Sequence, residues 1–168
     1  ARTLDAVPAL QVAVAANGGP ICAGLTLTLG ATAVAGGTYS WNGPNGFTST
    51  QQNPSIPNAQ PINSGDYFVT VTANGCTSTP ARTVAEVRPQ PTVTASNTSP
   101  VFAGETVQLN ATNVVGGTFS WTGPLGFTSN QQNPTIPNAQ PENSGQYCVT
   151  VNLNGCTARS CTDVVVRP

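Results

Sequence analysis

Cysteine is the residue of this sequence with the greatest capacity for covalent chemistry. The chain has no His and no Lys, so the side chains that most often serve as general bases are missing. No arrangement of cysteines has the spacing of a zinc site. In a chain with so few charges, the cysteines are better interpreted as disulfides with one thiol left over. The five are Cys22, Cys76, Cys148, Cys156 and Cys161.

The first half of the chain contains two cysteines, and we expect them to pair. These are Cys22 and Cys76. In the chain-entropy description, a disulfide that closes a loop of this length stabilises the folded state by about 4 kcal/mol. Such a cross-link matters in a small unit, which buries only a modest fraction of its surface.

The second half contains three cysteines, and a predicted hairpin selects two of them. If Asn154 and Gly155 form a two-residue turn, Leu153 lies opposite Cys156, and Cys148 then lies opposite Cys161. That pair falls at a non-hydrogen-bonded position, where side chains approach closely. We therefore expect a Cys148–Cys161 cross-strand disulfide and a free thiol at Cys156. The alternative, a Cys156–Cys161 bond, would leave Cys148 without a partner.

The acidic residues do not form a catalytic pattern. The chain has six, which are scattered, and the repeated segments share none of them: Asp66 corresponds to Gln146, and Glu142 corresponds to Ile62. No Asp-rich loop indicates a calcium site. We expect no catalytic, cofactor-binding or metal-binding residue, and therefore no enzyme activity.

The composition excludes two further classes of protein. Charged residues make up 7% of the chain, against roughly 25% in ordinary globular proteins, and the net charge is −1. Without a basic face, binding of nucleic acid is not expected. No apolar run is long enough to span a bilayer, so membrane insertion is not expected either.

The sequence repeats itself after 80 residues. Residues 36–78 align without gaps to 116–158, with 32 identities in 43 positions. Self-similarity at a fixed period indicates tandem units. We expect one repeat over 8–88 and a second over 89–168. Residues 1–7 resemble residues 81–87, so they are interpreted as the last strand of a preceding repeat or, alternatively, as an N-terminal arm.

Each repeat has the pattern of an all-β sandwich. Short runs rich in β-branched residues alternate with Gly, Pro and Asn clusters, which predicts seven strands and two packed antiparallel sheets. In the first repeat the strands are expected over 9–16, 24–34, 37–42, 46–51, 54–59, 65–73 and 76–87.

Alternation along these strands assigns the core. Leu25, Leu27 and Leu29 are expected to share one buried face. The aromatic residues could instead form a sugar-stacking platform, but their period-2 placement favours packing in the core. The expected structural core includes Trp41, Trp121, Tyr67 and Tyr147.

The segment around each Tyr resembles a corner of immunoglobulin-like domains. The match is Asn63-Ser64-Gly65-x-Tyr67, repeated as 143–147. The resemblance implies a Tyr hydroxyl bonded to nearby backbone, and Trp41 and Trp121 fall where these folds place a core Trp. The chain departs from the family at Val69 and Val149, where the inter-sheet Cys is usual. The expected architecture is therefore two tandem immunoglobulin-like antiparallel β-sandwich domains.

The chain further resembles the Ig-like and PKD-like repeats of large cell-surface proteins of Bacteroidetes, including gliding-motility adhesins. The residues that carry this resemblance are ICAG at 21–24, GGTYSWNGPNGF at 36–47 and SGDYFVTVTANGCTS at 64–78. It implies secretion by the type IX route and an extracellular location at the cell surface.

Three functions follow as hypotheses. The first is a non-catalytic structural or adhesive module that forms a semi-rigid stalk or filament, whose partners are neighbouring repeats or like subunits end to end, and a surface glycan or protein. The second is a carbohydrate-binding accessory module of a secreted enzyme. The third is a fibre subunit that donates residues 1–7 as a strand to another chain.

Overall fold

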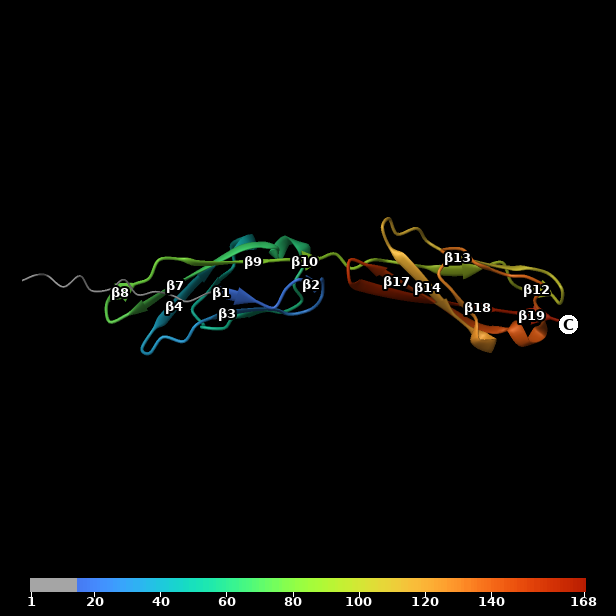
Figure 1. Cartoon of the computed structure of the whole chain (residues 1–168), viewed down its shortest axis with the longest axis horizontal. Coiled ribbons are helices and arrows are strands. Elements are labelled where there is room, and N and C mark those ends of the chain that lie inside the picture. Colours follow the sequence, from blue (N-terminus) through green and yellow to red (C-terminus); the bar gives the residue numbers. More distant parts are fainter. Residues whose placement is uncertain (1–14) are drawn as a thin grey trace, which may run out of the picture. The chain divides into compact units, whose positions relative to one another are not determined.

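The computed structural model describes residues 15–168 and divides the chain into two compact units. The division falls between Pro89 and Gln90. Each unit, taken by itself, is an antiparallel β-sandwich with four-to-five-stranded and three-stranded sheets and short connections (Figure 1). The fold class expected from the strand pattern is confirmed. The interpretation of residues 1–7 falls outside the described residues.

Unit 1 is built from ten strands and two short 3-10 turns. The strands are β1 (Ala15–Asn17), β2 (Ile21–Cys22), β3 (Leu27–Ala31), β4 (Thr38–Asn42), β5 (Thr48–Ser49), β6 (Ser55–Ile56), β7 (Gly65–Ala73), β8 (Cys76–Thr77), β9 (Ala81–Ala85) and β10 (Val87–Arg88). The turns are η1 (Pro44–Gly46) and η2 (Pro61–Asn63).

The strands of unit 1 form two main sheets. One has the order β1-β3-β6, and the other has the order β5-β4-β7, with β8 and β9 both paired to the far edge of β7. A short parallel pair, β10 with β2, places Arg88 beside Cys22. The last strand of the unit therefore ends beside β2.

Unit 2 repeats this arrangement with one change in its final strands. Its elements are β11 (Ala95–Asn97), β12 (Val101–Phe102), β13 (Val107–Ala111), β14 (Thr118–Thr122), η3 (Pro124–Gly126), β15 (Thr128–Ser129), β16 (Thr135–Ile136), η4 (Pro141–Asn143), β17 (Gly145–Leu153), β18 (Cys156–Val164) and β19 (Val166–Arg167). The sheets are β11-β13-β16 and β15-β14-β17-β18, with β12 parallel to β19.

The change is one extra residue in unit 1. In unit 2, β17 and β18 pair without interruption from Leu153↔Cys156 to Gly145↔Val164. In unit 1 the register shifts by one between Ala73↔Cys76 and Val69↔Ala81. Ser78 lies at the shift, and its Oγ accepts a hydrogen bond of 3.0 Å from the Val71 amide. The insertion is absorbed as a bulge, which leaves the rest of the strand in place.

Each sandwich has its own core of side chains from both sheets. In unit 1 the cluster includes Leu27, Leu29, Trp41, Tyr67 and Val69. In unit 2 the matching residues are Val107, Leu109, Trp121, Tyr147 and Val149. The four aromatic residues expected in the core are therefore all buried, each at most 1% exposed.

The expected burial of Leu25 is wrong. Leu25 is 56% exposed, because β3 begins only at Leu27. The residues before it form a turn, in which the Leu25 amide bonds to the carbonyl of Cys22. The strand alternation therefore does not extend to Leu25. Glu105 stands at the equivalent position of unit 2, which fits a site that faces solvent.

Candidate functional site

The repeated tyrosines close a corner at the start of β7 and β17. The hydroxyl of Tyr67 donates a 2.7 Å hydrogen bond to the carbonyl oxygen of Asn63, and Tyr147 donates to Asn143 at 2.9 Å. Burial removes water from both phenols and raises the pKa of each above its ordinary value. This is the backbone bond that the resemblance implied, and it ties the 3-10 turn to the strand that follows.

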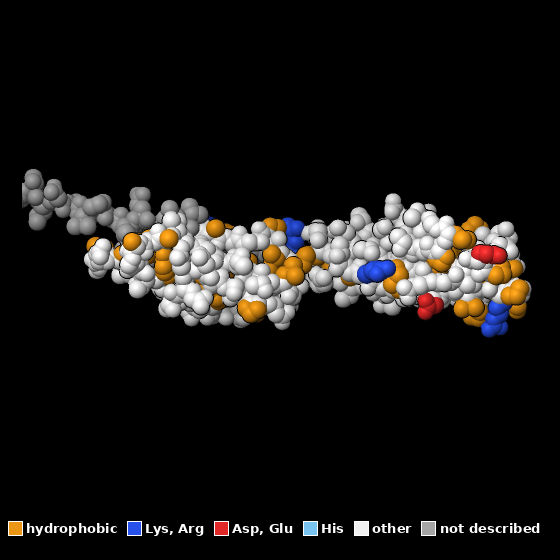
Figure 2. Space-filling view, turned by 90° about the horizontal axis from the view of Figure 1, so that it is seen from below, with side chains coloured by type: hydrophobic (Ala, Val, Ile, Leu, Met, Phe, Trp, Pro, Cys, Tyr) orange, Lys and Arg blue, Asp and Glu red, His pale blue; other side chains and the backbone are white. Residues whose placement is uncertain are grey.

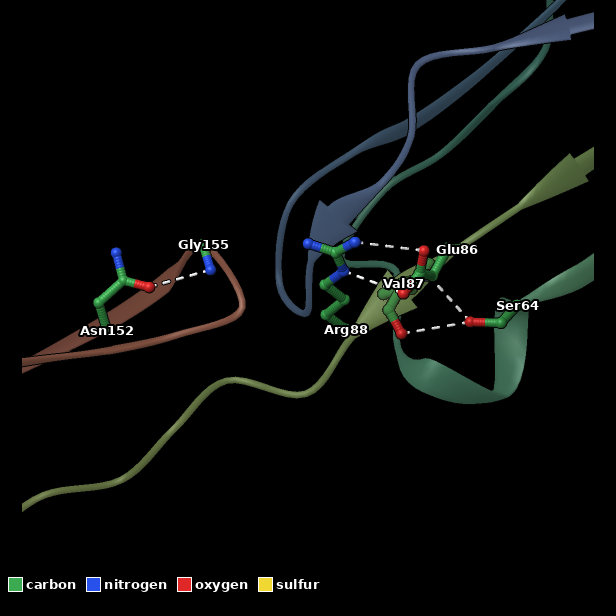
Figure 3. A network of polar contacts seen from close by, with 6 residues as sticks. All are labelled: Ser64, Glu86, Val87, Arg88, Asn152 and Gly155. Atoms are coloured by element: carbon green, nitrogen blue, oxygen red, sulfur yellow. Dashed lines mark hydrogen bonds and ion pairs between the residues drawn. The ribbon is translucent and has the colours of Figure 1, made fainter. Parts of the chain in front are cut away.

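The residues before each tyrosine complete the corner. Asn63 Oδ1 accepts a hydrogen bond from the Gln60 amide at 2.8 Å, which caps η2. Ser64 reaches the last strand: its Oγ accepts from the Val87 amide at 2.9 Å and lies 3.2 Å from the Val87 carbonyl oxygen (Figure 3). Beside it, Arg88 forms an ion pair with Glu86, with 2.9 Å between Nε and Oε1. The corner therefore secures the end of the chain in the unit.

Glycine is required where the corner meets the β4–η1 connection. A Cβ on Gly43 would overlap ring atoms of Tyr67, and a Cβ on Gly123 would overlap the ring of Tyr147. Phe47 packs edge-on against the same Tyr67 ring, with centroids 5.5 Å apart. The repeated Gly, Phe and Tyr are thus explained by one packed cluster in each unit.

The repeated Gln-Asn pair is bonded to β3. The side-chain amide of Gln52 donates to the carbonyl of Ala31 at 2.8 Å, and Asn53 Oδ1 accepts from the Ala31 amide at 3.3 Å. Gln132 and Asn133 make the same bonds to Ala111, at 2.8 and 3.1 Å. Two exposed-looking polar residues in the sequence therefore satisfy a strand edge.

A further polar bridge escaped the sequence reasoning. Asn17 at the end of β1 donates through Nδ2 to Thr83 Oγ1 at 2.6 Å and to the Val84 carbonyl at 2.9 Å. Asn97 makes the matching bonds to Thr162 and Asp163. The one signal in the sequence was the recurrence of this Asn after 80 residues, because its partners lie more than 60 residues away.

The cysteines of unit 2 follow the predicted hairpin register. Asn154 and Gly155 have positive φ angles of 52° and 88°, as a two-residue type I′ turn requires. Cys148 lies directly opposite Cys161, and a disulfide joins them. Cys156 was expected to be a free thiol, and this is wrong: it is disulfide-bonded. The expectation assumed that each unit closes its own disulfides.

The expected Cys22–Cys76 pair of unit 1 is also wrong. Cys76 is a free, exposed cysteine, whereas Cys22 is disulfide-bonded. Cys76 pairs with Ala73 at the start of the last strand, and Cys22 pairs with Arg88 at its end. Twelve extended residues separate these points, or roughly 30–40 Å, and a disulfide needs Cα atoms within about 7 Å. Counting cysteines could not reveal that they stand at opposite ends.

The described residues offer no assembled reactive centre. Within residues 15–168 no three Cys, Asp or Glu side chains are close enough to hold a metal ion. Two surface hollows, one beside β1 and β3 and one beside β14, have no ionisable side chain in their lining. Figure 2 shows a face on which charged side chains are few and uncharged polar groups and backbone predominate. No helix in this part of the chain is long and apolar enough to cross a membrane.

The aromatic side chains do not form an exposed platform. Both Trp residues, Tyr67 and Tyr147 are buried. Tyr39 is partly buried, and its hydroxyl bonds to the backbone at Thr32 and Val34. The geometry expected of a sugar-stacking Trp or Tyr surface is therefore not present in the two units.

Solved structures show the same fold at low sequence identity. The chain is similar to a crystal structure of a mouse coronavirus receptor-binding domain complexed with its murine receptor, at 15% identity and a TM-score of 0.54, over 92% of this chain and 98% of that one. It is similar to immunoglobulin domains 1–4 of Sidekick-1, at 20% identity and 0.54, over 94% and 48%. It is also similar to extracellular domains 3–5 of Drosophila OTK, at 17% and 0.53, over 94% and 63%.

The search of curated proteins gave no match. A family described as an Ig-like domain, CHU_C associated, matches residues 8–91. That range covers unit 1, and unit 2 repeats its sequence and its elements. The tyrosine corner, the two sheets and this match agree, and the chain belongs to the CHU_C-associated Ig-like domain family.

Proposed function

We propose that this chain is a non-catalytic extracellular module of a large bacterial cell-surface protein, in which tandem Ig-like units form a semi-rigid stalk or filament. The family match and the disulfides support an extracellular structural or adhesive role. Ig-like domains commonly bind other proteins, so neighbouring repeats, like subunits and a surface protein or glycan are the partners proposed. A gliding-motility adhesin is the specific parent that the sequence resembles.

The observation that carries this proposal is the use to which the repeated polar residues are put. In an enzyme or a ligand-binding module, side chains common to two copies would converge on a cleft. Here the shared Ser, Asn, Gln and Tyr side chains bond to backbone of their own unit, at the corner, the cap and the strand edge. The repeated motif maintains a sandwich, which is what a spacer or scaffold requires.

The low charge supports lateral or end-to-end assembly. With a net charge of −1 on 168 residues, copies of the chain repel one another weakly. The Pro89 that follows Arg88 at the unit boundary restricts local backbone freedom, which favours a semi-rigid connection. Strand donation by residues 1–7 remains an alternative mode of assembly for this same function.

Immunolabelling of intact cells tests the location and role. Antibodies raised against the purified chain should label unpermeabilised source cells, and deletion of the segment should shorten the surface structure without removing a hydrolytic activity. Labelling that appears only after permeabilisation would contradict the surface location. Release of sugars from a polysaccharide panel by the purified chain would contradict the non-catalytic assignment.

A further inference from the structure

The same hairpin carries a cysteine in both units. Cys76 pairs with Ala73 across the Asn74–Gly75 turn, and Cys156 pairs with Leu153 across the equivalent turn. In both turns the two central residues have positive φ, so the backbone geometry is alike. The two cysteines therefore occupy one structural position, at the same end of each sandwich.

Their chemical states differ. Cys156 is buried and disulfide-bonded, and its partner is neither Cys148 nor Cys161, because those two are bonded to each other. Cys76 is exposed and free. The hairpin position is thus a disulfide position in one unit and an unused thiol in the other.

Chain connectivity shows which end of a unit the hairpin occupies. The side-chain amide of Gln90, the first residue of unit 2, donates a 3.0 Å hydrogen bond to the carbonyl of Thr157, directly after Cys156. The chain therefore enters a unit beside its hairpin cysteine.

The other disulfide position lies at the opposite end. Cys22 lies beside Arg88, where the chain leaves unit 1. It is disulfide-bonded, and Cys76, the other cysteine of its unit, is free. A unit of the first type therefore carries one disulfide position at its entry end and one at its exit end.

We propose that Cys76 is a covalent attachment site for a preceding Ig-like unit, which supplies a cysteine at the position of Cys22. Two thiols lose two electrons and two protons to form the bond, and a small-molecule disulfide such as oxidised glutathione accepts them and becomes two thiols. This inference rests on the proposed stalk function and adds to it a cross-link that restricts bending between beads.

Unit 2 provides the means to test this, because it lacks the exit-end cysteine. Phe102 stands at the position of Cys22 and is 60% exposed. The experiment joins two copies of the chain in tandem, with Pro168 followed by residue 10, which reproduces the spacing of Pro89 and Gln90. Without further change, the Cys76 of both copies should react with a maleimide in a glutathione redox buffer, giving about two labelled thiols per tandem chain.

Phe102→Cys in the first copy should then capture Cys76 of the second copy. Labelling should fall to about one thiol per tandem chain, and non-reducing chymotryptic mapping should find position 102 linked to Cys76. The control is Val115→Cys in the first copy, another exposed apolar residue of unit 2, which should leave Cys76 of the second copy reactive. Continued labelling of that Cys76 in the Phe102→Cys tandem, or equal capture in the control, overturns the proposal and leaves the cell-surface assignment untouched.

Discussion

The side-chain oxygen of Ser64 accepts a 2.9 Å hydrogen bond from the amide of Val87, 23 residues later in the chain. The same oxygen lies 3.2 Å from the Val87 carbonyl, so one hydroxyl pairs both backbone groups of a buried residue in β10. Ser144 and Val166 repeat the contact at 2.9 and 3.3 Å. A short polar side chain thereby connects the tyrosine corner to the strand at which the unit ends.

Ser64→Ala should destabilise unit 1 because it leaves the Val87 amide without this acceptor. Loss of a partner for a buried donor costs about 1–3 kcal/mol. Urea unfolding should show the loss, and hydrogen exchange at the Val87 amide should accelerate. Ser40→Ala is the matched control, since Ser40 is exposed on β4, and it should change the free energy of unfolding by less than about 0.5 kcal/mol. Equal effects of the two substitutions would contradict the assigned role.

Local patterns made part of this structure predictable. The tyrosine corner lies within five consecutive residues, and the β17–β18 register follows from one two-residue turn, so both could be read from the sequence. The state of Cys22 could not, because it depends on which end of the sandwich each cysteine occupies, and strand order decides that. Leu25 failed for a related reason: alternation does not say where a strand begins.

The bulge at Ser78 shows the same limit. A one-residue difference between the repeats was visible in the alignment, but the sequence did not reveal how unit 1 would accommodate it. The Ser78 hydroxyl bonds to Val71 across the sheet, and this contact exists only after the strands are paired. Residues whose partners are distant in sequence, such as Asn17 with Thr83, were missed in the same way.

Gly43→Ala should destabilise unit 1 through a clash alone. Gly43 has a φ of −172°, an extended conformation open to any residue, so the backbone imposes no penalty. The new methyl would overlap the Tyr67 ring, and overpacking a core costs about 1–3 kcal/mol. Thermal unfolding measures the effect.

The control for this clash is Gly46→Ala. No atom lies within 4 Å of a Cβ there, but φ is +71°, so the cost comes from the backbone and amounts to about 1–2 kcal/mol. Replacing Tyr67 with Leu, which removes the ring, should reduce the cost of Gly43→Ala and leave that of Gly46→Ala unchanged. An undiminished Gly43 effect in that background would show that the Tyr67 ring is not its cause.

The chain should lose stability in alkali through its two buried tyrosines. Burial raises the pKa of Tyr67 and Tyr147 above the ordinary value of about 10. The folded state therefore holds these protons more tightly than the unfolded chain does. Their contribution is complete below about pH 10 and is lost as the pH rises through the raised pKa values of the folded state.

Unfolding by urea at a series of pH values from 8 upward should show this decline. The double variant Tyr67→Phe, Tyr147→Phe should have a lower free energy of unfolding near pH 8, because two hydrogen bonds worth about 0.5–1.5 kcal/mol each are lost. It should also decline less steeply above pH 10. A decline as steep as that of the original chain would show that other groups govern the alkaline transition.

The Cys148–Cys161 disulfide should stabilise unit 2 and leave its fold unchanged. The bond joins directly opposed residues in the middle of the β17–β18 pair, 13 positions apart in sequence. For a loop of this length the chain-entropy description gives about 3 kcal/mol. Replacing both cysteines with Ser should lower the urea midpoint of unit 2 accordingly, with its far-UV circular dichroism retained, because the hydrogen-bonded ladder and the Tyr147 corner do not depend on the bond. Cys76→Ser, at an exposed free thiol, should leave the midpoint unchanged. If the double Ser variant unfolded at the same urea concentration as the original chain, the strand pairing alone would account for the stability of this edge.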